Sequence, residues 1–216
     1  MSLLSKNSKM KNSENTTYKR IFNFTLPALQ TKEGFKTCPN ASACAVGCYA
    51  RQGAYVFSNV AKKHHANFAA TLSPTFINDM LQEINKLKPD LIRIHDSGDF
   101  YNESYLQSWL TIIKITPKVK FYAYTKMISL FKKYQANNLL PINFTIIYSL
   151  GGKEDHLIDQ NIDRHSKVFN NLTDLENQGY IDTSKDDTKA LGINNKIGLV
   201  YHGNKKYSNT QWERIK

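Results

Sequence analysis

The chain has 216 residues, of which 41% are hydrophobic and 12% aromatic. This length and composition suit one domain with a packed core. No stretch approaches the roughly 18 consecutive apolar residues of a membrane-spanning helix, and no apolar segment of a secretory signal follows the first basic residues. These observations argue against a membrane-spanning protein, and they predict a cytoplasmic protein without membrane contact.

The net charge is +11 and the sequence pI is about 9.4. Because a basic surface attracts phosphate groups, this charge predicts a nucleotide or nucleic acid as partner or substrate. The alternative is a basic surface that serves only solubility. Residues 1–18 are basic with little apolar content, and we expect them to form a flexible tail. Residues 19–216 are then expected to form a single α/β domain that carries a cysteine loop at 37–50.

The first part of this domain alternates between strand and helix patterns. Alternating apolar and polar residues predict a strand at 20–25. A loop rich in Pro and Gly follows at 27–53, and a helical pattern covers about 56–72. Ser73-Pro74 is typical of a helix start, with Ser73 as the N-cap, and the apolar stripe behind it predicts a second helix.

The same alternation continues through the rest of the chain. Asn102 is expected to cap a helix that Pro117 ends. A further helix is expected at about 127–137. The remaining strands are expected at 91–95, 119–124, 144–148, 167–169 and 197–201.

About six strands joined mostly by helices predict parallel βαβ units with right-handed crossovers. A full eight-stranded barrel typically needs about 250 residues, so this length favours a partial (βα)6 barrel with the helices outside. A flat, doubly wound sheet is the alternative, because periodicity does not separate the two.

Polar and titratable residues follow most of the predicted strands. In α/β folds the reacting groups lie at the carboxyl ends of the strands, so we expect these residues to share one edge. In chain order they are the cysteine loop, His95-Asp-Ser-Gly-Asp-Phe100, Thr125-Lys126, Ser149-Leu-Gly-Gly-Lys153 and His202-Gly203.

The three cysteines of the chain, Cys38, Cys44 and Cys48, lie within eleven residues. An odd, clustered set argues against disulfides and predicts a shared metal. Three thiolates suit a [4Fe-4S] cluster with one iron left open. They also suit zinc with a histidine as fourth ligand, and the candidates for it are His64, His65, His95 and His202. A third interpretation is that the cysteines are small packed side chains.

The loop Cys38-Pro-Asn-Ala with Cys48-Tyr-Ala, followed by βα units, resembles the radical-SAM superfamily, although its C-x5-C-x3-C spacing is wider than the usual one. The segment from Cys38 to Lys126, with Arg-Ile-His-Asp-Ser-Gly-Asp-Phe and Tyr-Thr-Lys, more closely resembles the bacteriophage gene product 88-like family. The resemblance implies a partial barrel of the radical-SAM type, a [4Fe-4S] cluster on the three cysteines, S-adenosylmethionine, an electron donor, and the host cytoplasm if a phage encodes the chain.

The resemblance also implies roles for other residues at this edge. Ser97, Gly98 and Asp99 occupy the place of a motif that holds the methionine end of S-adenosylmethionine. Asp99 and Lys126 are the candidate catalytic residues. Ser149 and Gly151 would approach the adenosine or sulfonium side of the same ligand.

Each of these assignments has a plainer alternative. Asp96 and Asp99 are common turn residues and helix caps, and His95 suits a core position. Lys126 suits a solvated strand end. At the level of function, one alternative is a zinc-stabilised basic protein that binds nucleic acid or a host protein without catalysis. Another is a degenerate enzyme scaffold that keeps the cluster but has lost turnover.

Overall fold

The computed structural model describes residues 2–202, and it has one parallel sheet of seven strands within that range. The sheet order is β1-β2-β3-β4-β5-β7-β6, and every neighbouring pair is parallel. The strands are β1 (Ile21–Phe24), β2 (Leu91–Ile94), β3 (Lys120–Thr125), β4 (Phe144–Ser149), β5 (His165–Phe169), β6 (Ile181–Asp182) and β7 (Lys196–Val200).

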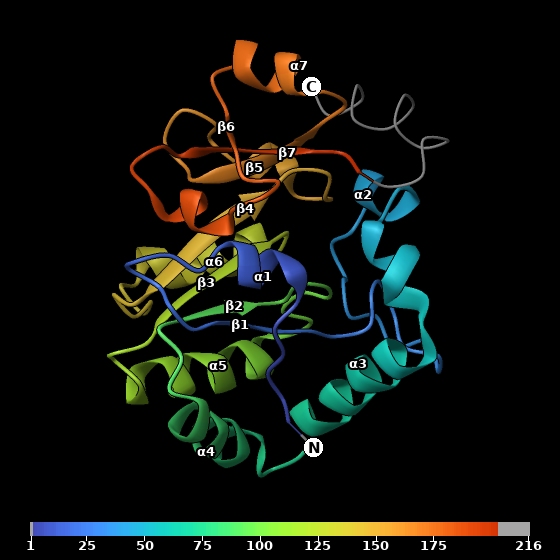
Figure 1. The fold of residues 1–216 in the computed structure, drawn as a ribbon, viewed down its shortest axis with the longest axis vertical. Coiled ribbons are helices and arrows are strands. Elements are labelled where there is room, and N and C mark those ends of the chain that lie inside the picture. Colours follow the sequence, from blue (N-terminus) through green and yellow to red (C-terminus); the bar gives the residue numbers. More distant parts are fainter. Residues whose placement is uncertain (1, 203–216) are drawn as a thin grey trace.

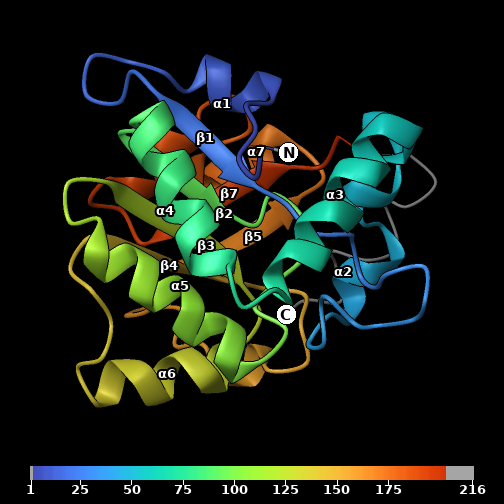
Figure 2. The ribbon, with the colours of Figure 1, turned by 90° about the horizontal axis from the view of Figure 1, so that it is seen from below.

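The sheet curls into a half-barrel with helices on its outer side (Figures 1 and 2). This confirms the predicted partial barrel, with β6 as an additional edge strand. The helices are α1 (Ser8–Asn12), α2 (Ala43–Val46), α3 (Ser58–Thr71), α4 (Phe76–Leu87), α5 (Glu103–Ile115), α6 (Ile128–Ala136) and α7 (Leu172–Asn177). Short 3₁₀ turns lie at η1 (Tyr49–Arg51), η2 (Gly53–Val56), η3 (Asp155–Leu157) and η4 (Asp187–Leu191).

Helices α4, α5 and α6 cover the outer face of the sheet and form the main core with it. Trp109 of α5 is fully buried and packs edge-on against Phe24 of β1. Asn102 caps α5 as predicted, because its side chain accepts a hydrogen bond from the Tyr105 N–H at 2.8 Å. At α4 the predicted N-cap is wrong. The cap is Thr75, and the Ser73 hydroxyl instead accepts a bond from the Thr75 N–H.

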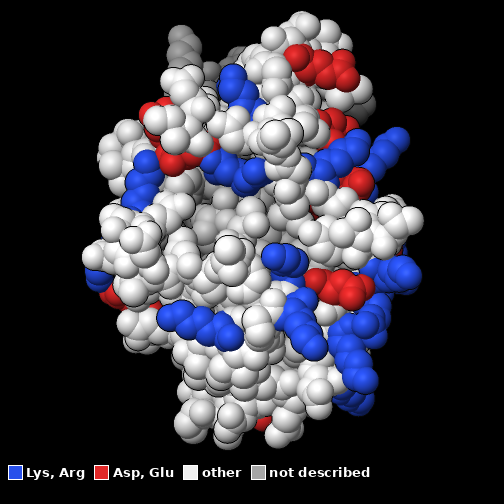
Figure 3. All heavy atoms as spheres, turned by 90° about the vertical axis from the view of Figure 1, so that its left-hand side faces the viewer, with Lys and Arg blue, Asp and Glu red and all other residues white. Residues whose placement is uncertain are grey.

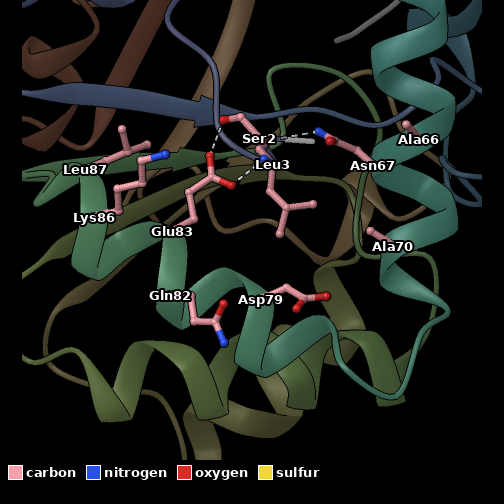
Figure 4. A pocket seen from close by; sticks show the side chains of 10 residues that line it. All are labelled: Ser2, Leu3, Ala66, Asn67, Ala70, Asp79, Gln82, Glu83, Lys86 and Leu87. Atoms are coloured by element: carbon pink, nitrogen blue, oxygen red, sulfur yellow. Dashed lines mark hydrogen bonds between the residues drawn. The ribbon is translucent and has the colours of Figure 1, made fainter.

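The N-terminal segment differs from the expected tail, because residues 2–18 pack on the fold. Ser5 pairs with Asn23 of β1, and Met10 is fully buried in the half-barrel. Figure 4 shows how the segment crosses the crevice of about 610 Å³ between α3 and α4. There the Glu83 carboxylate accepts a bond from the Leu4 N–H, and Asn67 donates to the Leu3 carbonyl. Buried apolar side chains and hydrogen bonds to α3 and α4 together hold the segment on the fold.

A buried ion cluster occupies the concave side of the sheet. Asp187 of η4 is inaccessible to solvent, and its carboxylate accepts from Arg93 of β2 at 2.9 Å and from Tyr122 of β3 at 2.8 Å. Lys9 of α1 forms an ion pair with the same carboxylate at 2.9 Å. These neighbours stabilise the charged form strongly enough to hold the Asp187 pKa at about 2, although burial alone would raise it.

We expect Asp187→Asn to lower the free energy of unfolding by about 3 kcal/mol, since it leaves Arg93 buried with only the more distant Asp96 carboxylate at 3.4 Å. Urea denaturation at neutral pH measures this loss. Glu103→Gln, which breaks an exposed ion pair with Lys133, is the control and should cost much less. Equal losses in the two variants would contradict the assigned importance of the cluster.

The same cluster sets a direction for the pH dependence of stability. The folded-state pKa of Asp187 lies below its ordinary value of 3.8. Its contribution is therefore complete above the unfolded pKa and is lost as the pH falls toward about 2. The stability difference between wild type and Asp187→Asn should shrink over that interval, and a difference that grows would be inconsistent with the depressed pKa.

Candidate active site

A cavity of about 280 Å³ opens at the carboxyl ends of the strands. Its lining comes from the cysteine loop, from the segments after β2, β3 and β4, and from the end of β7. The sequence-predicted residues that line it are Cys38, Cys44, Cys48, Ser97, Gly98, Asp99, Lys126 and Ser149. His202 also lines it, whereas its predicted neighbour Gly203 lies outside the described residues. The topology thus brings together residues that are far apart in the chain.

Gly151 has a different place from the one expected. It does not line the cavity, and its carbonyl accepts bonds from the N–H groups of Ser42 and Cys44 at 3.2 and 3.1 Å. Lys153 N–H donates to the Asn40 carbonyl at 2.9 Å, which fixes the other side of the same contact. The turn after β4 therefore holds the cysteine loop in place from behind.

A glycine at position 152 permits the close approach of the turn to the cysteine loop. A Cβ there would lie 3.0 Å from the Asn40 carbonyl oxygen and 3.1 Å from the Lys126 Cβ. We expect Gly152→Ala to push the cysteine loop off the turn and to speed the reaction of its thiols with a disulfide reagent such as DTNB. Gly192→Ala is the control, because a Cβ there meets only an ordinary contact at 3.4 Å. Unchanged thiol reactivity in Gly152→Ala would show that the loop does not depend on this approach.

The segment after Cys48 is fastened to the end of β2 by two tyrosines that sequence reasoning missed. The Tyr55 hydroxyl donates to the Asp96 carboxylate at 2.5 Å, and the Tyr49 hydroxyl donates to the Asp96 carbonyl. Asn7, from the N-terminal segment, donates to the same carboxylate at 2.9 Å. Nothing local in the sequence signals these pairs, because their partners lie more than 40 residues away.

Asp99 joins the turn after β2 to the end of β3. It is buried, and its carboxylate accepts bonds from the Thr125 hydroxyl at 2.7 Å and from the N–H groups of Lys126 and Phe100, both at 2.8 Å. Burial raises the Asp99 pKa, and these bonds oppose that shift. The carboxylate therefore fixes the cavity wall between β2 and β3. This is more than the turn residue or helix cap of the plainer interpretation.

Lys126 lies between β3, β4 and the cysteine loop. Its ammonium group donates to the Ser149 hydroxyl at 2.6 Å, and its carbonyl accepts a bond from Asn40 at 3.1 Å. Ser97 is also engaged, because its hydroxyl donates to the Leu26 carbonyl. Hydrogen bonds thus link Asp99, Lys126 and Ser149, whereas Leu26 holds Ser97 separately.

The surroundings of two of the cysteine thiols disfavour their ionised form. Burial raises the Cys38 pKa to about 12, and the Asp99 carboxylate adds to the shift. Burial also raises the Cys48 pKa, while the charges of Lys126 and Arg51 oppose it. Both thiols are therefore protonated at neutral pH, and a metal that binds them must displace the protons.

The histidines do not complete a preformed metal site. His95 lies in the aromatic core, where its Nε2 bonds the Tyr105 hydroxyl at 2.8 Å and burial lowers its pKa to about 3. The His202 ring lies 5.9 Å from the Tyr49 ring, and the His64 ring lies 6.0 Å from that of Tyr55. Within residues 2–202, no three His, Cys, Asp or Glu side chains are arranged to hold one metal ion.

The fold and the site define a class: a parallel α/β half-barrel with a three-cysteine loop at the carboxyl edge of its sheet. Within it, the chain belongs to the Gene product 88 family, whose model matches residues 1–214. This confirms the predicted resemblance to the phage family.

Two curated relatives are the Gene 88 proteins of Mycobacterium phage L5 and Mycobacterium phage D29. Each is 32% identical to the chain over 111 residues, which is 46% of the chain and 46% of the relative. The match therefore spans less than half the length of either relative. No solved structure matches the chain. Along residues 2–202, none of the helices has the length and apolar character needed to cross a membrane.

Proposed function

We propose that the protein binds a [4Fe-4S] cluster through Cys38, Cys44 and Cys48 and binds S-adenosylmethionine beside it, as a radical-SAM-like enzyme. The observation that carries the proposal is that all three cysteines line one cavity at the carboxyl ends of parallel strands. Three thiolates leave one iron of a cubane without a cysteine ligand, which is the position that an external ligand needs.

Zinc and an iron–sulfur cluster place different demands on the three cysteines. A zinc ion requires all of its sulfur ligands at about 2.3 Å from one centre. No such group exists among the described residues. In a cubane each cysteine binds a different iron, so the sulfurs stand farther apart. Neither site is preformed among residues 2–202, so metal and sulfide analysis of the reconstituted protein decides between them.

The charges and backbone around the cysteines support a second ligand. Lys126 and Arg51 oppose the unfavourable burial of thiolate charge at Cys48. Gly98 has φ +85, and a Cβ there would lie 2.5 Å from that of Leu26, so only glycine suits this turn. The Asp99 carboxylate accepts three hydrogen bonds, and a carboxylate has about four acceptor positions, so one is left for a further donor such as an amino group.

In this proposal the chain itself orients the ligands and excludes water. When bound, the reduced cluster supplies the electron that cleaves S-adenosylmethionine. Ser97, Gly98 and Asp99 would hold the methionine end, and Ser149, which Lys126 links to Asp99, would approach the adenosine or sulfonium side. An external electron donor and a substrate, with a nucleotide or nucleic acid as the leading class, complete the reaction.

Anaerobic reconstitution with iron and sulfide tests the cluster. The wild type should turn brown, absorb broadly at about 400 nm as iron–sulfur clusters do, and contain about four irons per chain. Cys44→Ala should lose this absorption, whereas Ser42→Ala, in the same loop with no side-chain cap bond, should keep it. A colourless wild type with stoichiometric zinc would contradict the enzyme proposal and favour the zinc-stabilised binding protein.

Reductant and S-adenosylmethionine then test the reaction through release of 5′-deoxyadenosine. Lys126→Gln should retain the cluster and lower this release by about tenfold or more, because the cavity wall loses its bond to Ser149. Lys36→Gln, on the exposed surface, should have wild-type activity. If the wild type carries the cluster but releases no 5′-deoxyadenosine, it is a cluster protein that does not catalyse this reaction.

A further inference from the structure

The edge of the sheet opposite the cavity carries a concentration of positive charge. Helices run antiparallel to the strands in βα units, so the ends of α4 and α5 meet the starts of β1, β2 and β3 at this edge. Figure 3 views the molecule from that side, and Lys and Arg side chains are spread over the middle of the face with fewer acidic side chains among them. We call this surface the basic rim, and its residues are Lys19, Arg20, Lys86, Lys88, Lys118 and Lys120, all exposed.

The backbone places these residues side by side. The Asp90 N–H donates to the Arg20 carbonyl at 2.9 Å, and the Lys120 N–H donates to the Asp90 carbonyl at 3.0 Å. Adjacent strands lie about 4.8 Å apart, so the starts of β1 and β3 stand about 10 Å from each other. The rim is therefore continuous across three strands.

Little of this charge is neutralised within the protein. Asp90 approaches Arg20 at 3.8 Å, and its carboxylate otherwise accepts backbone N–H groups of Lys19 and Arg20. Among the ion pairs of residues 2–202, none involves Lys19, Lys118 or Lys120. These ammonium groups are available to an external anion.

Helix ends explain only part of the rim. Lysine in the last turn of a helix is stabilised by the helix dipole, which accounts for Lys86 at the end of α4. Lys19, Arg20 and Lys120 stand at the starts of strands, where no such dipole exists. Their accumulation on one edge needs another reason.

We propose that the basic rim binds the phosphate backbone of double-stranded DNA without sequence preference. Exposed lysines on mobile stems suit phosphate contacts, which position a protein and carry no sequence information. A lipid bilayer would also require several exposed apolar side chains among the lysines. Ile115, at the end of α5, lies beside them, whereas the exposed Ile142, Ile162 and Ile193 precede β4, β5 and β7. The rim faces away from the cysteine cavity, so it tethers the protein and leaves the cavity free. This proposal does not depend on the cluster.

Fluorescence anisotropy with a labelled DNA duplex, in increasing KCl, tests the rim. Each phosphate contact contributes about 0.9 to the slope of log K against log salt. The triple variant K19Q/K118Q/K120Q should therefore reduce the magnitude of the slope by about two to three, and should weaken binding at least tenfold at low salt. Because all three side chains are exposed, thermal unfolding should be unchanged, and the single variants give the same test if the triple variant is unstable.

The matched control, K32Q/K36Q/K62Q, removes the same charge from exposed lysines after β1 and near the start of α3. It should keep the wild-type slope. An equal loss in both triple variants would overturn the rim, because it would reflect net charge alone. Absence of DNA binding by the wild type would also overturn it, and binding of anionic phosphatidylserine vesicles that the rim variant alone loses would assign the surface to a membrane instead.

Discussion

Two buried carboxylates at the end of β2 hold the cavity in shape. Asp99 takes the backbone N–H of Lys126 and the hydroxyl of Thr125, so it fastens β2 to β3. The Asp96 carboxylate accepts hydrogen bonds from Tyr55 and Asn7, so it fastens the segment after the cysteine loop and the N-terminal segment to the same turn. A buried carboxylate is costly unless its bonds are satisfied, and this cost ties all four segments to one arrangement.

The parts of the fold that were predictable are those whose signal is local. The stripe of α5, the Asn102 cap and the strand–helix alternation predicted the half-barrel, and the polar residues after each strand predicted which side chains share the cavity. The missed parts depend on distant partners. Met10 looks like a lone apolar residue in a polar tail until the interior of the half-barrel surrounds it, and β6 is only two residues long.

The candidate site likewise has a part that the sequence predicted and a part that depends on distant partners. The clustering of three cysteines is visible in the sequence, whereas Tyr49 and Tyr55 matter only because the turn after β2 lies beside them. Gly151 was expected beside a ligand and instead supports the cysteine loop through its carbonyl. Part of the positive charge also has a place that the sequence did not predict, because six of the 29 Lys and Arg residues form the basic rim at the edge opposite the cavity.

The bond between the Asp187 N–H and the Ser13 hydroxyl joins residues 174 positions apart. Contacts of such long sequence separation form late, because the entropy of closing the loop must be overcome first. During synthesis the first residues emerge long before η4 exists, so Ser13 and Lys9 have no Asp187 to bind until it does. The interior of the half-barrel is therefore closed by residues from near both ends of the described chain, and a chain that lacks η4 leaves Met10 and Lys9 without this closure.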